Sequence, residues 1–344
     1  MIMVQALRLT SFSHGAGCAC KLGPRDLTRV LDLLGPATKP EDVLVSEETG
    51  DDAAVYRLAD GSGLVLTLDF FTPLVDDPGD WGRIAAANAL SDVYAMGGTP
   101  RLALNVAGWP VDELPLELLA DVLAGAREVA VRAGATVVGG HTITTEREPL
   151  FGMVAVGFLD ADAIVRNSTA RPGMHLYLSK PIGTGLITTA IKRGQTDEDH
   201  ARLAVETMTA LNADASAAMV SAGVGAATDV TGFGLLGHLR KMLEASGCAA
   251  IVDAGSVPLL PSVLHLARRD IVAGGTKRNQ AWLHEVTDWG DLTPPEQIVL
   301  ADAQTSGGLL VASDRSPSAE LFTEIGEVVS GPRGSIAVVG RVRE

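Results

Sequence analysis

The residues best suited to chemistry stand near the N-terminus, in a glycine-rich segment that carries two cysteines and a lysine. Residues 13–21 read Ser-His-Gly-Ala-Gly-Cys-Ala-Cys-Lys, which places Lys21 three residues after Cys18. A thiolate is a strong nucleophile and a soft ligand, and a nearby cation lowers its pKa. Lys21 could supply that charge or bind a phosphate. Cys-x-Cys is a weak motif by itself, and an uninvolved chain end explains it equally well.

Carboxylates at the ends of apolar elements form a second group of candidates. Asp51 and Asp52 precede a strand pattern, and alternation along a strand would point them to opposite faces. Asp69 closes an apolar strand, where a carboxylate is costly unless it is solvated or paired. Asp92 follows Asn88 by four residues on an otherwise apolar helix, so the two share a face. Taken singly, these patterns also fit ordinary turns and hydrogen-bonded polar pairs.

The segment after Asp229 contains the pattern Gly-x-Gly-x-x-Gly at residues 232–237, and the next strand ends in Asp253. This order is typical of a dinucleotide-binding unit, which is the strongest competing hypothesis. Charge argues against it, because Asp229 stands just before the turn that a dianionic pyrophosphate would occupy. With Mg²⁺ the same carboxylate becomes a useful ligand, and the start of the helix can still face a phosphate.

The sequence contains neither a Gly-x-x-x-x-Gly-Lys-Ser/Thr loop nor the protein-kinase motifs. An ATP site would therefore depend on dispersed Asp residues that hold several Mg²⁺ ions. Residues 304–310 predict a polar turn that enters an apolar strand. Residues 274–279 predict a cationic, glycine-rich loop, which could meet a phosphate or be solvated. The remaining histidines show no metal-ligand spacing and are expected to be structural: His175, His200, His265 and His284.

The elements that must position these groups alternate between strands and helices. Strands are predicted at residues 53–58, 64–70, 101–109, 136–138 (short and buried), 151–158, 175–179, 249–253 and 336–342, with a further short strand ending at Asp229. Helices are predicted at residues 24–34, 80–96, 114–133, 198–213, 233–245 and 318–326, and after Gly185. The polar segment 167–173 predicts a domain boundary. We expect an α/β (α+β) protein with a mobile N-terminal loop (1–23) and two domains (24–166 and 174–344).

Size and charge narrow the classes of function. The chain has 344 residues, of which 47% are apolar, enough for two domains with substantial cores. The net charge is −15 and no basic run exists, which argues against a nucleic-acid or anionic-membrane binder. Three cysteines, an odd and low number, indicate a reducing compartment, and no uncharged apolar stretch predicts a transmembrane helix. We expect a cytoplasmic protein.

Together and in this order, the motifs resemble those of the selenophosphate synthetases (selenide, water dikinases) over nearly the whole chain. The most specific segments are residues 13–21, 49–56, 88–98, 228–238 and 304–310. The broader superfamily includes aminoimidazole ribonucleotide synthetase, thiamine-monophosphate kinase and a hydrogenase-maturation enzyme. The Cys-x-Cys-Lys segment distinguishes the selenide-using branch.

The resemblance implies that ATP, selenide and water are converted into selenophosphate, AMP and phosphate with the help of several Mg²⁺ ions. It implies mixed sheets packed with helices, a homodimer in which the N-terminal sheets pair, and a selenium-delivery protein as a partner. By matching positions, Cys18 is the catalytic thiol and Lys21 the catalytic cation on phosphate. The implied Mg²⁺ ligands are Asp52, Asp92 and Asp229. The implied nucleotide-binding residues are Lys21, Thr49, Gly50, Asp51, Asp69, Asp92, Gly140, His141 and Thr142. Some relatives have arginine where this chain has Gly50, which leaves only a backbone contact there.

Two alternatives stay open at this point. The first is another ATP-dependent enzyme of the same superfamily, either a small-molecule kinase or a sulfur-using relative. The second is a non-catalytic regulator that binds a nucleotide or a metal. Selenide-dependent formation of AMP from ATP distinguishes the first, and the effect of Cys18→Ser on turnover distinguishes the second.

Overall fold

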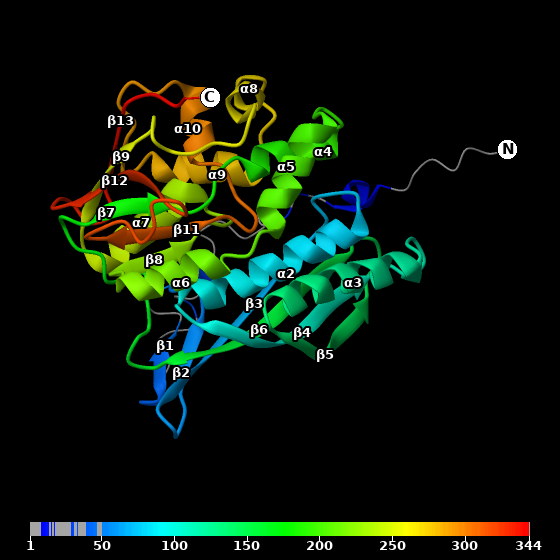
Figure 1. The fold of residues 1–344 in the computed structure, drawn as a ribbon. Helices are drawn as coiled ribbons and strands as arrows, with labels where there is room; N and C mark the ends of the chain where they lie inside the picture. The colour runs from blue at the N-terminus through cyan, green and yellow to red at the C-terminus, as the bar shows by residue number, and fades with distance from the viewer. Residues whose placement is uncertain are drawn as a thin grey trace.

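The computed structural model describes residues 8–13, 15, 17, 29–30, 33, 39–46 and 50–343. Two sheets, each packed with helices, account for most of this chain (Figure 1). One sheet is built from residues 43–160 and the other from residues 175–339, and a short 3-10 helix, η1 (Leu9–Phe12), precedes both. The prediction of an α/β protein with mixed sheets is confirmed.

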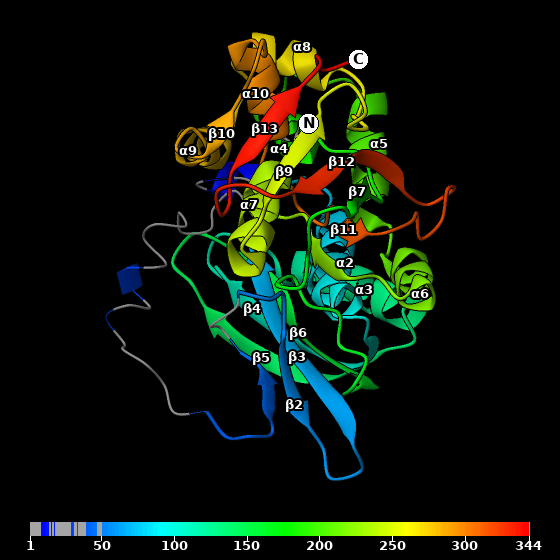
Figure 2. The same cartoon turned by 90° about the vertical axis from the view of Figure 1, so that its left-hand side faces the viewer.

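The first sheet has six strands. Their spatial order is β1 (Val43–Val45), β2 (Ala54–Arg57), β3 (Ser62–Phe71), β6 (Leu150–Asp160), β4 (Thr99–Trp109) and β5 (Thr136–Thr144). All neighbours are antiparallel except β4 and β5, which are parallel and joined by α3 (Leu116–Arg132). Helix α2 (Pro78–Ala95) packs beside α3 on one face of this sheet (Figures 1 and 2). Asp77 caps the start of α2, because its carboxylate accepts a hydrogen bond from the Asp80 N–H.

Strand β3 has one face toward the helices and an apolar face that no described helix covers. Thr67 and Asp69 face α2, to which both are hydrogen-bonded. Leu66, Leu68 and Phe70 alternate with them on the open face and are 46%, 49% and 48% exposed. The described chain therefore leaves a large apolar sheet face open to solvent.

The second sheet has seven strands, and both of its faces are covered. Their order is β10 (Thr287–Asp288), β13 (Ile336–Val339), β9 (Ala249–Asp253), β12 (Thr323–Val329), β7 (His175–Leu178), β11 (Leu309–Ser313) and β8 (Ala226–Asp229). The helices of this half are α4 (Thr184–Arg193), α5 (Glu198–Thr209), α6 (Ala213–Ala222), α7 (Gly234–Ser246), α8 (Val263–Arg268), α9 (Gly274–Leu283) and α10 (Pro294–Leu300). Helix α6 packs against β11 and α7 against β8, while α2 of the first half contacts α5, α6 and β8. The two halves thus meet along α2.

The predicted helix at residues 318–326 is wrong. Residues 323–329 form strand β12, which pairs with β7 on one side and β9 on the other. The window is short, and two partner strands distant in sequence satisfy its backbone groups better than an isolated helical turn could.

Three further local predictions need correction. Residues 274–279 are not a loop, because they begin helix α9. The short buried strand at residues 136–138 is the nine-residue edge strand β5, most of which is exposed. The single helix predicted at residues 198–213 is two helices, since α5 ends at Thr209 and α6 begins at Ala213. The predicted helix at residues 24–34 lies almost wholly outside the described residues.

In the described part of the chain, no helix combines the length and the apolar character needed to cross a bilayer. The longest helix, α2, has 18 residues and is buried within the protein.

Candidate active site

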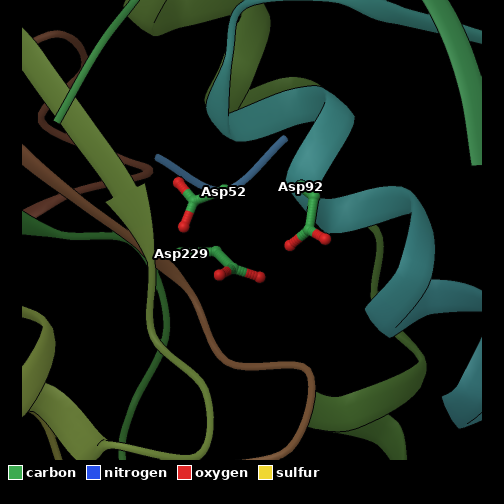
Figure 3. Close-up of side chains that lie close together, drawn as sticks. All are labelled: Asp52, Asp92 and Asp229. Carbon is green, nitrogen blue, oxygen red and sulfur yellow. The ribbon is translucent and has the colours of Figure 1, made fainter. Parts of the chain in front are cut away.

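Three aspartates converge where α2 meets the second sheet (Figure 3). One carboxylate oxygen from each of Asp52, Asp92 and Asp229 lies within 4.8 Å of the others. Asp92 and Asp229 are buried, with 7% and 1% of their surface exposed. Oxygen donors at this spacing are suited to a hard cation such as Mg²⁺.

Strand β3 and helix α2 each place two polar residues on the face that they turn toward one another. Thr67 and Asp69 are two residues apart on one face of β3, and Asn88 and Asp92 are four apart on one face of α2. Thr67 donates a hydrogen bond to Asp92 Oδ2 at 2.5 Å, and Asn88 Nδ2 donates to Asp69 Oδ2 at 2.7 Å. The pairing of the two elements therefore fixes both carboxylates.

The second half supplies Asp229 and orients Asp52. Asp229 is the last residue of β8, where it pairs with Leu309 of β11. The neighbouring Thr228 hydroxyl donates to Asp52 Oδ1 at 2.8 Å, across 176 residues of sequence. Among the described residues, the other oxygen of Asp52 is buried without a hydrogen-bond partner. That oxygen is a natural ligand position for a cation.

Burial and mutual repulsion disfavour the ionised forms of Asp52 and Asp92. Burial raises the pKa of Asp92 well above its usual value, and the charges of Asp229, Asp69 and Asp52 raise it further. Burial also raises the pKa of Asp52 well above its usual value, followed by the charge of Asp229. Carboxylates held together in this way bind a divalent cation strongly, because the cation relieves their mutual repulsion.

Two lysines interact electrostatically with members of the cluster, Lys180 with Asp229 and Lys241 with Asp52. Lys180 is buried, and its ammonium donates to the carbonyls of Ala210 and Ser306 at 2.7 and 3.1 Å. Burial lowers the pKa of Lys180 to about 7, although the charge of Asp229 opposes this shift. Lys241 is half-buried above the ring of Phe233, with 4.7 Å between Nζ and the ring centroid, and its charge favours the ionised form of Asp52.

The turn before β11 joins the two halves at the site. Ser306 has a left-handed φ of 50°, which points its N–H to Asn88 Oδ1 at 2.9 Å. Asn88 in turn holds Asp69, so the turn of the second half supports a carboxylate of the first. Residues 304–310 thus form the polar turn and apolar strand that were predicted, and they also act as a structural bridge.

One asparagine, Asn167, holds both Gly50 and Asp51. The Asn167 N–H donates to Asp51 Oδ1 at 2.6 Å, and Asn167 Nδ2 donates to the Gly50 carbonyl at 2.8 Å. Asp51 and Asp52 thus have different partners, although both precede β2 (Ala54–Arg57) and strand alternation is not the cause. A side chain added at Gly50 would begin 3.8 Å from the Lys241 ammonium, so Lys241 already places a positive charge beside this position.

Gly140, His141 and Thr142 lie within edge strand β5 and not in a turn. Asp69 and Gly140 share one row of the sheet, but Met153 of β6 and Asn105 of β4 stand between them. Gly140 also has a packing role, since an added Cβ would lie 2.3 Å from the Asn105 carbonyl oxygen. Within one chain, two strands therefore separate Gly140 and its neighbours from Asp69.

Cys18, Lys21 and Thr49 lie outside the described residues, and their assigned roles stay predictions. Gly17, directly before Cys18, is described and buried. A Cβ at Gly17 would lie 2.5 Å from Thr305 Oγ1, so the Gly17 backbone touches the turn that supports Asn88.

The structure gives the residues of the dinucleotide-like pattern other roles. The Thr231 N–H donates to Nε2 of His238, seven residues further on, which closes the turn on itself. Asp253 accepts hydrogen bonds from the Gly255 N–H and the Ser256 hydroxyl in a local turn. Neither end of the pattern is thus arranged as a dinucleotide site would require.

Sequence reasoning left several supporting residues unassigned: Thr67, Asn167, Lys180, Thr228, Lys241 and Ser306. Thr67 had a detectable signal, because it lies two residues before Asp69 on the same strand face. The others are brought to the site by contacts between distant segments. Thr228 and Ser306 do lie in the motif segments 228–238 and 304–310, but their contacts with Asp52 and Asn88 do not follow from the local sequence.

Residues 50–159 match the family "AIR synthase related protein, N-terminal domain", and residues 171–339 match "AIR synthase related protein, C-terminal domain". The chain is 46% identical over 308 residues to the selenide, water dikinase of Yersinia pseudotuberculosis serotype I (strain IP32953), covering 89% of this chain and 87% of the relative. It is 43% identical over 340 residues to the selenide, water dikinase of Photobacterium profundum, covering 98% and 96%.

Among solved structures, the thiamine monophosphate kinase from Aquifex aeolicus has a similar fold, with a TM-score of 0.66. The match covers 93% of this chain and 98% of that chain at 18% sequence identity. Identity at this level supports a shared fold alone.

Proposed function

The chain belongs to the selenide, water dikinase family, and from this membership we propose that it makes selenophosphate from ATP, selenide and water, releasing AMP and phosphate. It is an enzyme of the ATP-using kinase type. The observation that carries the proposal to particular residues is the convergence of Asp52, Asp92 and Asp229 from both halves of the chain. A cluster of three carboxylates is what several bound phosphates with their Mg²⁺ counter-ions would need.

Mg²⁺ fits the residues present. The donors are hard carboxylate oxygens within 4.8 Å of one another, and one oxygen of Asp52 has no hydrogen-bond partner among the described residues. Asp52, Asp92 and Asp229 would hold the metal, and Asp69 would bind the nucleotide directly or through it. When bound, Mg²⁺ neutralises the negative charge that collects on AMP, phosphate and selenophosphate.

The other residues in the proposal bind and orient the nucleotide. Thr49, Gly50 and Asp51 would line the nucleotide, with Asn167 holding the last two in place. Cys18 would be the catalytic thiol and Lys21 the cation on phosphate. The contact of Gly17 with Thr305 supports this proposal, because it brings the residue before Cys18 to the edge of the carboxylate network.

We also propose a homodimer that covers the open face of the first sheet. In register, Leu68 of β3 lies beside Val154 of β6 and Leu104 of β4, which makes a continuous apolar row. The exposed apolar residues of this face are Tyr56, Leu66, Leu68, Phe70, Leu102, Leu104, Ile143 and Phe158. An apolar sheet face of this extent favours burial against a second copy. In such a dimer, Gly140, His141 and Thr142 could reach the nucleotide bound to the partner chain.

A charge on this face should disrupt the dimer. Leu68→Asp would place a carboxylate in the middle of the apolar row, where burial against a second sheet is costly. We expect the variant to elute as a monomer in size-exclusion chromatography with light scattering. Val131→Asp, on the solvent side of α3, is the matched control and should leave the oligomeric state unchanged. A wild-type monomer, or a dimeric Leu68→Asp variant, would contradict the proposed interface.

The reaction itself is tested by phosphorus NMR of the wild-type protein with ATP, Mg²⁺ and selenide under anaerobic conditions. We expect AMP, phosphate and a selenophosphate signal, each dependent on selenide. Formation of ADP as the final nucleotide, without any requirement for selenium, would show that the proposed reaction is wrong.

Three further points belong to the same proposal. We place the boundary between the two domains at residues 167–173, between the strands β6 and β7. We propose a cytoplasmic location, because selenide and a catalytic thiol both need a reducing environment. A protein that delivers selenium to the site is the proposed partner.

A further inference from the structure

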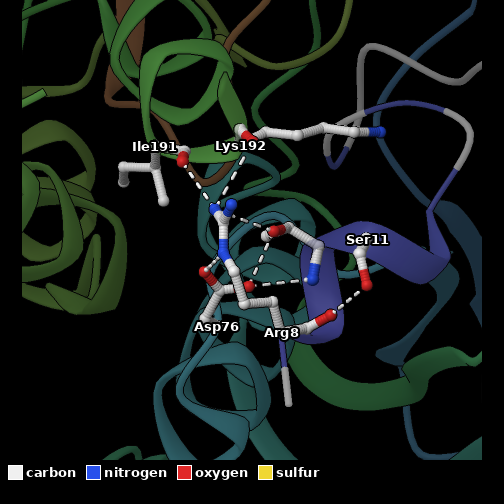
Figure 4. Close-up of polar contacts among 6 residues, drawn as sticks. Arg8, Ser11, Asp76, Ile191 and Lys192 are labelled. Atoms are coloured by element: carbon white, nitrogen blue, oxygen red, sulfur yellow. Dashed lines mark hydrogen bonds and ion pairs between the residues drawn. The ribbon is translucent and has the colours of Figure 1, made fainter. Parts of the chain in front are cut away.

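The N-terminal segment is attached to both halves of the protein before it reaches the site. Arg8 Nε donates to Asp76 Oδ2 at 2.8 Å, and Arg8 Nη2 donates to the Ile191 carbonyl at 2.8 Å (Figure 4). Asp76 lies between β3 and α2 of the first half, whereas Ile191 lies in the last turn of α4 in the second. One guanidinium therefore connects the first half to the end of α4.

The residues that follow Arg8 are held just as closely. Asp76 Oδ1 accepts from the Thr10 N–H at 3.0 Å and from the Thr10 hydroxyl at 2.6 Å. Leu9 is 1% exposed, and the Ser13 hydroxyl forms a buried 2.6 Å hydrogen bond with that of Thr72. This is the packing of a structural segment and not of an unattached chain end.

Lys192 binds the N-terminal segment at Ser13 and Gly15. Its ammonium donates to the carbonyl oxygens of Ser13 and Gly15, the latter at 2.9 Å. The Ser13 hydroxyl also donates to the Gly15 carbonyl at 2.7 Å, so Ser13 and Gly15 are joined to each other as well as to the Lys192 ammonium. A lysine in the last turn of a helix is also favoured by the helix dipole.

Helix α4 connects this turn to the carboxylate network through its other end. The Thr305 N–H donates to Thr184 Oγ1 at 3.2 Å at the start of α4, and Gln304 Oε1 accepts from the Thr184 N–H at 3.0 Å. The backbone of Gly17 then touches Thr305. One ten-residue helix thus holds the Arg8–Gly15 segment at its C-terminal end and the Gln304–Thr305 turn at its N-terminal end.

We propose that Lys192, supported by Arg8, is a positioning residue for the reaction. The two cations attach the chain to α4 ahead of Gly17, and Gly17 lies beside the turn that supports Asn88 and, through it, Asp69. This inference rests on the proposed function, in which Cys18 and Lys21 act at that place. Lys192 itself does not take part in the bond changes.

Lys192→Met tests the inference, because it keeps the aliphatic chain and removes the ammonium. We expect kcat for selenide-dependent AMP formation to fall by about 10–100-fold, the range that a displacement of about 1 Å costs an oriented reaction. The Kd for ATP with Mg²⁺ and the Tm should stay close to wild type. Lys192→Arg should restore most of the activity. Lys277→Met is the matched control. It removes an exposed ion pair between Lys277 of α9 and Asp270, and it should behave like wild type.

A readout without turnover separates this inference from the proposed function. In a Cys20→Ser background, the rate of Cys18 alkylation by iodoacetamide should change several-fold in Lys192→Met and not in Lys277→Met. If the wild type makes no AMP, the proposed function fails, while alkylation still tests the attachment. An unchanged alkylation rate together with wild-type kcat would overturn the inference. A fall in activity that only parallels a fall in Tm would overturn it too.

Arg8→Gln provides a second test if Lys192→Met folds poorly. Arg8 is 44% exposed at its side chain, so the protein should fold without it. We expect a smaller loss of kcat in the same direction, with unchanged ATP binding. Wild-type kcat and wild-type alkylation in this variant would remove Arg8 from the proposal.

Discussion

Replacing Asp92 with asparagine is expected to reduce selenide-dependent AMP formation by about 10²–10³-fold, the scale on which a single electrostatic group acts in catalysis. One carboxylate oxygen of Asp92 lies within 4.8 Å of one from each of Asp52 and Asp229, and the substitution removes one charge and one proposed metal ligand. The amide oxygen can still accept the hydrogen bond from Thr67, so the packing of α2 on β3 is retained. Steady-state kinetics with Mg²⁺ titrated at fixed ATP measures the effect.

Stability should respond in a way that distinguishes a metal ligand from a structural carboxylate. Without Mg²⁺, Asp92→Asn should unfold at the same Tm as wild type or higher, because burial and neighbouring charges already raise the pKa of Asp92 well above its usual value. With Mg²⁺, the wild type should gain Tm and the variant should gain much less. Asp253→Asn, in a local turn, is the matched control and should keep both activity and the Mg²⁺ response. Equal Mg²⁺ responses in wild type and Asp92→Asn would contradict the proposed metal site.

The same pKa shifts predict how the stability of the protein changes with pH. The pKa values of Asp52 and Asp92 are raised in the folded protein, so the metal-free fold favours their protonated forms and loses stability as pH rises through those values. Mg²⁺ at the proposed site would bind the ionised forms and offset that loss. The increase in Tm caused by Mg²⁺ should therefore be larger at pH 8 than at pH 6. A response that is independent of pH would show that these carboxylates do not bind the ion.

Cys18→Ser is expected to reduce selenide-dependent turnover by about 100-fold or more, which is the usual effect of removing one catalytic group. A serine hydroxyl neither ionises near neutral pH nor binds selenium as a soft ligand. Binding of ATP with Mg²⁺ should be retained, because the carboxylates proposed to bind it are unchanged. Cys20→Ser, two residues away, is the matched control and should keep most of the activity. Full turnover in Cys18→Ser would remove the thiol from the proposed mechanism.

Some of the fold follows from local patterns alone. Residues 53–58 and 64–70 alternate on either side of a tight turn, and they form β2 and β3 as predicted. The helix predicted at residues 80–96 is α2, with Asn88 and Asp92 on one face. Such elements are predictable because side-chain polarity at a period of two or 3.6 residues determines which face is buried.

Other elements depend on partners far away in the sequence. Residues 323–329 became a strand because β7 and β9 lie on either side of them, and no pattern within the segment contains that information. The acidic cluster likewise depends on contacts between distant segments, since Thr228 donates a hydrogen bond to Asp52 across 176 residues of sequence. The order of the motifs suggested that these aspartates belong to one site, but only the packing of α2 against β8 brings them together.

The sequence by itself thus determined which residues are proposed to carry the chemistry: the Cys18–Lys21 pair and the aspartates at the ends of apolar elements. It also determined the α/β alternation, because local periodicity and turn residues act over a few positions. Only the tertiary structure decided that Asp52, Asp92 and Asp229 share one space, that Ser306 supports Asn88, and that Lys192 holds the chain ahead of Cys18. These arrangements arise from close packing between segments that are distant in the chain, and local polarity does not specify which distant segments meet.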